Sequence, residues 1–366
     1  MTTSAPSDFI AVDWDTAVAT ARRVSGPGPR VEPDEARAAV EELRVDASRA
    51  REHVRAVTGL DPGAAPAPLL VVDRPGWVRA NAASMDQVIT PLMRRLQERK
   101  DPGALPSGLS GLGNSVGSKM TGLEAGSLLG YLSSKVLGQF DPFYDDEGAA
   151  GRLLLVAPNV VQVEAELQVD PSDFRLWVCL HEETHRVQFT AVPWMREHMR
   201  SQIDTFIAAA DLEPSVLLSR LGEVARGVVE SLRSRDEGPS LLDLVQGPEQ
   251  REALERMMAL MSLLEGHADV VMDAVGPDIV PSVAEIRRRF QHRRSAPRGM
   301  DRVVRRLLGM EAKLKQYREG AEFVRGAVGA VGMDGFNRVW ESPETLPTAD
   351  EITDPDTWVR RVHGAG

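Results

Sequence analysis

The sequence predicts a mainly helical α+β protein with a small β-sheet and many helices. Apolar residues recur at helical spacing through 15–60 and 77–99, and through almost all of the chain from residue 171 onward. Short apolar runs of the kind that form buried strands occur at LLVVD (69–73) and RLLLVAPNVVQVEAEL (152–167). The first run predicts one strand, and the second predicts one or two.

Composition and charge exclude several classes of protein. The chain has 366 residues and 42% hydrophobic content, enough for a large core. Its net charge of -11 argues against nucleic-acid binding, which needs a basic surface. The single cysteine, Cys179, rules out an intrachain disulfide and fits a reducing compartment. Because no secretory signal and no membrane-length apolar run is visible, we expect a cytoplasmic protein without a membrane partner.

A glycine-rich segment, 109–139, contains a predicted helix. Gly122, Gly126 and Gly130 are four residues apart and share one helix face. Glycine costs about 1 kcal/mol relative to alanine inside a helix, so close approach of a neighbouring backbone is the expected compensation. Earlier glycines form G-x-G-x-x-x-G, which is one residue too long for the dinucleotide-binding pattern and follows no strand. Helix packing is therefore favoured over nucleotide binding.

The segment CLHEETHRVQF lies on a helix that the sequence delimits well. Asp170 is a good N-cap residue, Pro171 is tolerated in the first turn, and Pro193 marks the end. These signals predict a largely apolar helix over about 171–190. Cys179 is expected to be a small buried residue that points away from the polar residues of the motif.

The pattern H-E-x-x-H on this helix has the spacing of a zinc site. His181 and His185 lie about 40° apart around the helix axis, so both imidazoles can reach one ion. Glu182 lies about 100° from His181, where its carboxylate can contact a metal-bound water without being a ligand. The pattern also occurs by chance on ordinary helices. A third ligand, which catalytic zinc sites require, decides between the two interpretations.

The best source of a third ligand is the apolar helix predicted over 257–275. Glu265 and Asp269 are four residues apart on one face, whereas His267 lies about 200° from Glu265. We expect Glu265 to be the third ligand, with His267 as the alternative. Asp269 is expected to accept a hydrogen bond from the distal nitrogen of a ligand histidine. In a purely structural interpretation, the two acidic side chains pair with arginines instead.

The combination of H-E-x-x-H with the later E-x-x-A-D resembles the gluzincin type of metallopeptidase. More specifically, the chain resembles an actinobacterial zincin-like family of predicted hydrolases that is often associated with deazaflavin coenzyme biosynthesis. The resemblance covers roughly 10–345. The segments that carry it are DRPGWVRAN, LGQFDPF, HEETHRVQF, EGHADVVMD and KLKQYREGAEFV.

The resemblance implies one zincin-like domain over 1–366 and Zn²⁺ as the cofactor. A helical region of about 1–148 is expected to pack on a metal-binding region of about 149–340. The interval between His185 and Glu265 is much longer than in thermolysin-like enzymes. The helices within this interval are therefore expected to be specific to the family.

The predicted function is that of a zinc-dependent hydrolase, with a peptide or protein as the favoured substrate. His181, His185 and Glu265 would hold the ion, and Glu182 would take a proton from the attacking water. The apolar segment 152–167 could supply an edge strand for an extended peptide. Two alternatives stay open: a non-catalytic binding protein stabilised by zinc, and a hydrolase of a non-peptide amide or ester.

Three further features complete the expectations. Tyr317 is the first candidate for stabilising an oxyanion, and His292 is the second. The C-terminal tail, 341–366, is expected to wrap the surface. A basic cluster is expected to form a solvated face, with recognition of a substrate carboxylate as the alternative. Its members are Arg287, Arg288, Arg289, Arg293 and Arg294.

Overall fold

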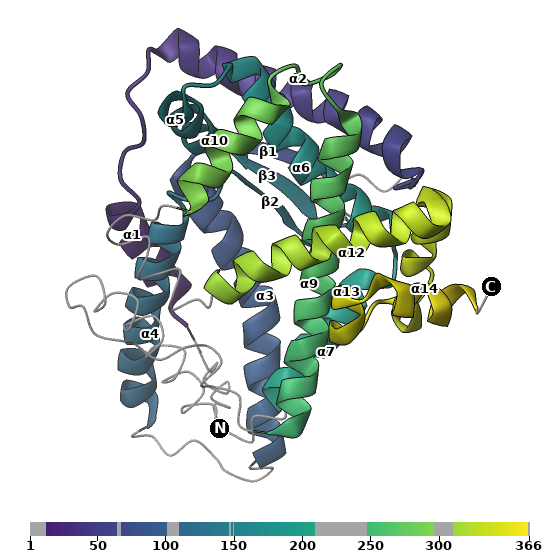
Figure 1. Ribbon diagram of the computed structural model, residues 1–366. Helices are drawn as coiled ribbons and strands as arrows, with labels where there is room; N and C mark the ends of the chain where they lie inside the picture. The colour runs from purple at the N-terminus through teal and green to yellow at the C-terminus, as the bar shows by residue number, and fades with distance from the viewer. Residues whose placement is uncertain are drawn as a thin grey trace.

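The computed structural model is built from helices packed around one small sheet (Figure 1). It describes residues 12–63, 67–100, 110–145, 148, 150–208, 247–295 and 310–364. The strands are β1 (Leu69–Val72), β2 (Gly138–Asp141) and β3 (Arg152–Val156). The helices from the N-terminus through α9 are α1 (Trp14–Val24), α2 (Pro33–Thr58), α3 (Arg74–Lys100), α4 (Ser110–Leu132), α5 (Ala157–Leu167), α6 (Pro171–Ala191), α7 (Met195–Ala208) and α9 (Pro248–Val275). The later helices are α10 (Val283–Ser295), α12 (Met310–Phe336), α13 (Ala349–Thr353) and α14 (Pro355–His363), with 3₁₀ turns at Asn337–Trp340 and Pro343–Thr345.

This architecture confirms the predicted fold class of many helices with a small sheet. The helix expected over 15–60 is present as α1 and α2, which are separated by a non-helical segment at 25–32. Within the described part of the chain, no helix combines the length and the apolar character that a bilayer crossing requires.

The sheet has the strand order β1-β3-β2, with β3 in the centre. β1 runs parallel to β3, and β2 runs antiparallel to it, with Gly138 opposite Leu155. All five residues of β3 are buried, as expected for a central strand. The expectation that an edge strand comes from 152–167 is therefore wrong, since both edges of β3 are already paired.

The second half of the segment 152–167 is also not a strand. β3 ends at Val156, and α5 begins at Ala157 with Pro158 in its first turn, where proline is compatible with a helix. Val160, Val163 and Leu167 are buried at helical spacing. A continuous apolar run does not by itself separate a strand from a buried helix, and here it contains both.

Helix α6, which carries the H-E-x-x-H segment, begins where the sequence predicts. The Asp170 carboxylate accepts a hydrogen bond of 3.0 Å from the backbone N–H of Asp173, which caps the first turn. The helix packs on α2 and α9, and Phe174 and Leu180 are fully buried. Cys179 is buried as expected, and its Sγ lies 3.7 Å from the carbonyl oxygen of Leu43 in α2.

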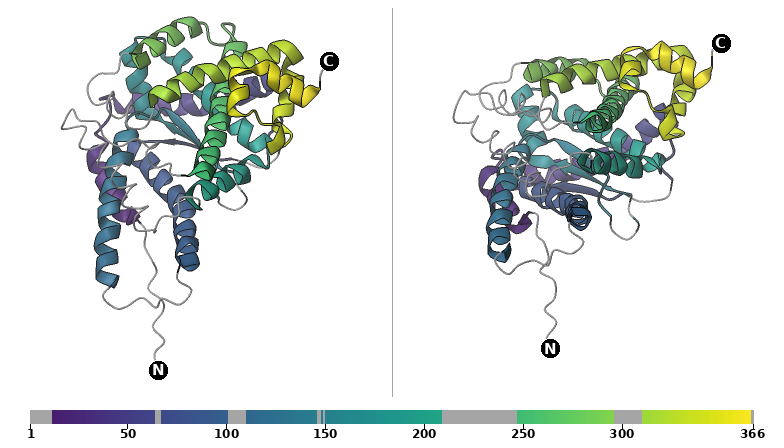
Figure 2. Two further views of the ribbon diagram at one scale, coloured as in Figure 1. Left: turned by 60° about the horizontal axis from the view of Figure 1, so that its bottom comes forward. Right: turned by 90° about the horizontal axis from the view of Figure 1, so that it is seen from below.

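The glycine-rich helix α4 packs directly against α1, which confirms the expected close approach. A Cβ atom on Gly122 would lie 2.5 Å from the carbonyl oxygen of Asp13. A Cβ on Gly126 would overlap the backbone of Ala17, and one on Gly130 would lie 2.8 Å from the Ala21 oxygen. Figure 2 shows α3 and α4 extending from the sheet toward the same side of the molecule.

The C-terminal segment is part of the core, so the expectation that it only wraps the surface is wrong. Trp358 of α14 is fully buried and packs edge-on against Phe323 of α12. Its indole N–H donates a hydrogen bond of 2.8 Å to the carbonyl oxygen of Thr345. Burial of a tryptophan with its polar atom satisfied fixes this segment against α12.

Candidate metal centre

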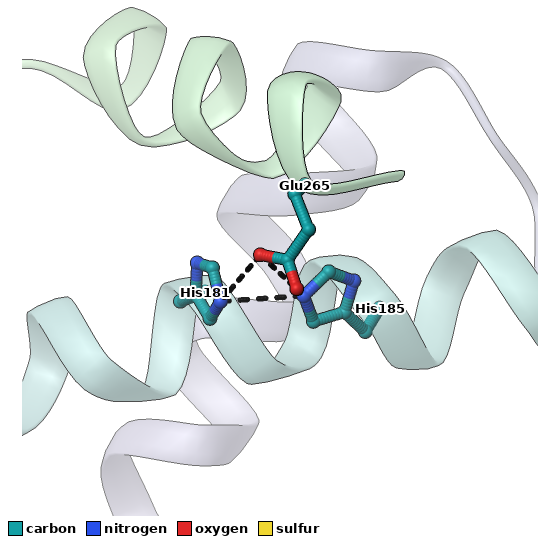
Figure 3. A group of neighbouring side chains, drawn as sticks. All are labelled: His181, His185 and Glu265. Atoms are coloured by element: carbon teal, nitrogen blue, oxygen red, sulfur yellow. Dashed lines mark hydrogen bonds and ion pairs between the residues drawn. The ribbon is translucent and has the colours of Figure 1, made fainter. Parts of the chain in front are cut away.

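Three potential ligands meet where α6 and α9 face each other (Figure 3). The Nε2 atoms of His181 and His185 lie 3.2 Å apart, and Oε2 of Glu265 lies 3.6 Å and 3.7 Å from them. A tetrahedral zinc ion with bonds of about 2.1 Å holds its ligand atoms about 3.4 Å apart. The donor set and its spacing therefore fit one zinc ion.

A close crossing of α9 and α12 fixes the position of Glu265. A Cβ atom on Gly266 would overlap the backbone of Gly320, and a Cβ on Gly320 would overlap the carbonyl oxygen of Ser262. The two helices thus touch backbone to backbone at the residue next to the third ligand. This crossing leaves α9 little freedom to rotate, so it fixes the position of the Glu265 backbone relative to α6.

The electrostatics of the three ligands suit a cation. Burial lowers the pKa of His185, but the hydrogen bond and negative charge of Glu265 outweigh it and raise that pKa to about 9. Without a metal, His185 therefore carries a proton at neutral pH where a metal would supply positive charge. Since a metal ligand must be the unprotonated imidazole, metal binding at neutral pH displaces this proton.

Glu182 lies next to the three ligands but is not one of them. Its side chain is buried, and burial raises the pKa of its carboxyl to about 8. Gly138, the first residue of β2, packs against it so closely that a Cβ atom there would lie 2.5 Å from Cγ of Glu182. The carboxylate is thus placed between the ligand-bearing helix and an edge strand of the sheet.

Comparison with known proteins agrees with this geometry. A model of the zincin-like metallopeptidase family matches residues 12–359. The chain belongs to this family. A crystal structure of a protein from Chloroflexus aurantiacus, described provisionally as a hydrolase with a novel fold, is 30% identical to the chain. The similarity covers 97% of this chain and 100% of the other, with a TM-score of 0.68. No curated protein matches the chain.

In this zincin-like protein, Asp269 does not bond a ligand histidine, so that expectation is wrong. Its Oδ1 accepts a hydrogen bond of 2.8 Å from Arg287 of α10, and its Oδ2 accepts one of 3.0 Å from Arg325 of α12. One turn beyond Glu265, α9 thus presents Asp269 to α10 and α12 rather than to α6. The alternative of pairing with arginines is correct for Asp269.

The partner of His185 is Gln188, which the sequence analysis did not identify. Nδ1 of His185 lies 2.9 Å from Oε1 of Gln188, and Nε2 of Gln188 lies 2.9 Å from the carbonyl oxygen of Leu264. The same Nε2 lies 2.9 Å from Nδ1 of His267. The position of Gln188 three residues after His185, on the same helix face, was the available signal.

His267, the alternative third ligand, is not in the ligand cluster. Its ring is fully buried, stacks on Phe336 at 5.5 Å and meets Trp340 edge-on at 5.4 Å. Burial, with a smaller effect from the charge of His185, lowers its pKa to about 3. The ring is therefore neutral, and it contacts the site through Gln188.

The two candidates for oxyanion stabilisation lie on different helices. Tyr317 is in α12, about one turn before the contact between Gly320 and α9, and its side chain lies outside the described residues. His292 is exposed on α10. The structure therefore leaves Tyr317 as a prediction.

The basic cluster is not a free solvated face. Arg287 pairs with Asp269 and Asp273, Arg289 donates to the carbonyl oxygen of Leu167, and Arg293 pairs with Glu166. These contacts attach α10 to α9 and α5. Arg288 is the most exposed member of the cluster that the structure describes, and the side chain of Arg294 lies outside the described residues.

Proposed function

We propose that this protein is a zinc-dependent hydrolase that cleaves peptide bonds. The observation that carries the proposal is the carboxylate of Glu182 beside the cluster of His181, His185 and Glu265. A purely structural zinc site generally uses four protein ligands, often cysteines, and has no use for an adjacent base. Among the described residues, three ligands converge, which favours an open position for a water or a substrate.

The chemistry that zinc would supply at this site is polarisation of a carbonyl group and a lower pKa for water. Glu182 would accept the proton of the attacking water at its carboxylate and donate it to the departing nitrogen. Burial raises the pKa of the Glu182 carboxyl, so its ionised form is a stronger base than an exposed carboxylate, and the positive charge of a bound zinc ion would favour that ionised form. Gly138 keeps the carboxylate in place from the other side.

The edge of β2 is the proposed binding site for an extended substrate. β2 forms one edge of the sheet, pairs antiparallel with β3, and begins at Gly138 against Glu182. A peptide that adds to this edge would gain main-chain hydrogen bonds while passing close to the proposed base. This edge replaces the one that the sequence analysis assigned to 152–167.

Tyr317 is retained in the proposal as the oxyanion-stabilising residue. Its place in α12 supports this, because α12 crosses α9 beside Glu265. In the proposed role, its phenolic O–H would donate a hydrogen bond to the oxygen that becomes negative during hydrolysis. The association with deazaflavin metabolism, and the cytoplasmic location, stay predictions from the sequence.

The test combines metal analysis with hydrolysis assays on the full chain. Wild-type protein is expected to contain about one zinc per chain and to cleave members of a mixed peptide library. Glu182→Gln should retain the zinc and lose about 10²–10⁴-fold in rate. Glu183→Gln is the matched control, because Glu183 is also buried on α6 but pairs with Arg186.

Each other outcome contradicts a specific part of the proposal. If the protein binds zinc but cleaves only esters or non-peptide amides, it is a zinc-dependent hydrolase and its substrate is not a peptide. Zinc binding without hydrolysis in any of these assays would favour a binding protein stabilised by zinc. A protein that binds no zinc, even after supplementation, would overturn the proposal.

A further inference from the structure

We infer that Gln188 is a positioning residue that determines which nitrogen of His185 faces the metal site, and that Leu264 and His267 hold its amide in the required orientation. The inference rests on the proposed zinc site. It concerns a hydrogen-bonded chain that links α6 to α9 behind the ligands: His185, Gln188, and then both His267 and the carbonyl group of Leu264.

The backbone of Leu264 fixes the orientation of the amide. A carbonyl oxygen only accepts hydrogen bonds, so the Gln188 atom 2.9 Å from it must be the amide nitrogen. The amide oxygen then faces Nδ1 of His185, also at 2.9 Å. Because that oxygen can only accept, Nδ1 must carry the proton. The unprotonated nitrogen of neutral His185 is then Nε2, the atom that faces His181 and Glu265.

The same reasoning assigns the opposite tautomer to His267. Its Nδ1 lies 2.9 Å from the amide nitrogen of Gln188, which donates one hydrogen to Leu264 and has one left. Nδ1 of His267 must therefore accept, and the ring proton is on Nε2. Within the described residues this Nε2 has no hydrogen-bond partner. The ring is thus held through Nδ1 and by its aromatic neighbours, Phe336 and Trp340.

The position of Gln188 makes it a link between two ligands. Its side chain is fully buried between α6 and α9. On one side it holds a ligand histidine of α6, and on the other it bonds the backbone immediately before Glu265. Without it, the His185 ring loses the acceptor that fixes both its tautomer and its rotation. The two helices also lose a polar contact beside the site.

The first measurement is zinc affinity of the full chain by competition with a chelator. Gln188→Leu is expected to weaken zinc binding by about 10–100-fold, the usual effect of removing a partner of a ligand histidine. Gln202→Leu is the matched control, because Gln202 is a buried glutamine on α7 and should leave the affinity unchanged. Equal affinities of wild type and Gln188→Leu would overturn the inference.

A pair of variants at His267 tests the second half of the chain. His267→Asn can place an amide oxygen near the position of Nδ1, so it should retain most of the zinc affinity. His267→Phe keeps the ring shape but removes the acceptor, and it should weaken binding. A merely structural role would not distinguish the two in this order. Stronger zinc binding by the phenylalanine variant would overturn the role of His267.

The second measurement needs no substitution, so it holds even if Gln188→Leu fails to fold. In zinc-loaded protein with ¹⁵N-labelled histidine, nuclear magnetic resonance should show His185 protonated at Nδ1 and His267 protonated at Nε2. A proton on Nδ1 of His267 would overturn the inference while leaving the zinc site intact. Absence of zinc binding by the wild type would instead overturn the proposed function, and the inference with it.

Discussion

Gly138 and Glu182 lie so close together that no side chain fits between them. A Cβ atom on Gly138 would lie 2.5 Å from Cγ and 2.9 Å from Oε1 of Glu182. The backbone of an edge strand therefore contacts the proposed base directly. Gly138 does not have a positive φ, so the requirement for glycine comes from space and not from backbone conformation.

Gly138→Ala is expected to reduce hydrolysis without removing zinc. The methyl group must push Glu182 or β2 aside, and a displacement of about 1 Å in a reacting group can lower the rate by about 10²-fold. The measurement is kcat/KM together with zinc content. Gly329→Ala is the control, because a Cβ there meets nothing within 4 Å. Full activity in Gly138→Ala would show that the position of Glu182 is not critical.

Substitutions at Glu265 and Asp269 should separate the ligand from the ion-pair network. Glu265→Ala is expected to lose zinc, since it removes one of three ligands. Asp269→Asn should keep zinc and lower the melting temperature slightly, because partly exposed ion pairs contribute only about 0.2–1 kcal/mol. Elemental analysis and thermal denaturation measure the two effects. Zinc loss in Asp269→Asn would restore Asp269 as a partner of the ligands.

Zinc affinity should depend on pH in the direction set by His185. The pKa of His185 in the zinc-free protein is about 9, against an ordinary value of 6.5, because Glu265 outweighs burial. Below pH 9 the ring is protonated, and zinc must displace that proton. Affinity should therefore rise with pH, by up to about tenfold per unit, and level off above pH 9. Competition titrations at several pH values would detect a flat profile, which would contradict this assignment.

Gly126→Ala is expected to destabilise the fold because its Cβ would overlap the backbone of Ala17. Overpacking of this kind typically costs about 1–3 kcal/mol, although alanine has the better helix propensity. The free energy of unfolding in denaturant measures the effect. Gly329→Ala, three residues before the break of α12 at Gly332 and with open space around its Cβ, should be neutral or stabilising by up to about 1 kcal/mol. Equal stability of the two variants would contradict a tight contact between α1 and α4.

The sequence predicted the features that depend on spacing along one helix. The cap at Asp170, the shared face of His181 and His185, and the glycine face of α4 all follow from helical geometry. Glu265 was identified because a carboxylate in a buried helix needs a partner. These inferences required no knowledge of how the helices pack.

The features that the sequence analysis missed depend on contacts between elements. The spacing of Gln188 three residues after His185 permits a contact between them. The orientation of its amide depends on the carbonyl group of Leu264, and backbone acceptors leave no sequence pattern. Asp269 was expected to bond a histidine of α6 because it shares a helix face with Glu265. The sequence does not tell which helices cover that face, and in the structure Asp269 bonds Arg287 of α10 and Arg325 of α12. β2 was missed because GQFD has a single large apolar residue, and its pairing with β3 defines the strand.

The separation of the ligands along the chain has a topological consequence. His185 and Glu265 are about 80 residues apart, so an ion bound to both would close the intervening chain into a loop. By the entropy relation used for disulfide cross-links, closing a loop of about 80 residues disfavours the unfolded chain by about 4–5 kcal/mol. Because the chain has a single cysteine, it cannot form an intrachain disulfide. The bound ion would act as the cross-link between α6 and α9 instead. Removal of the ion by a chelator should therefore weaken the packing of these two helices as well as stop hydrolysis.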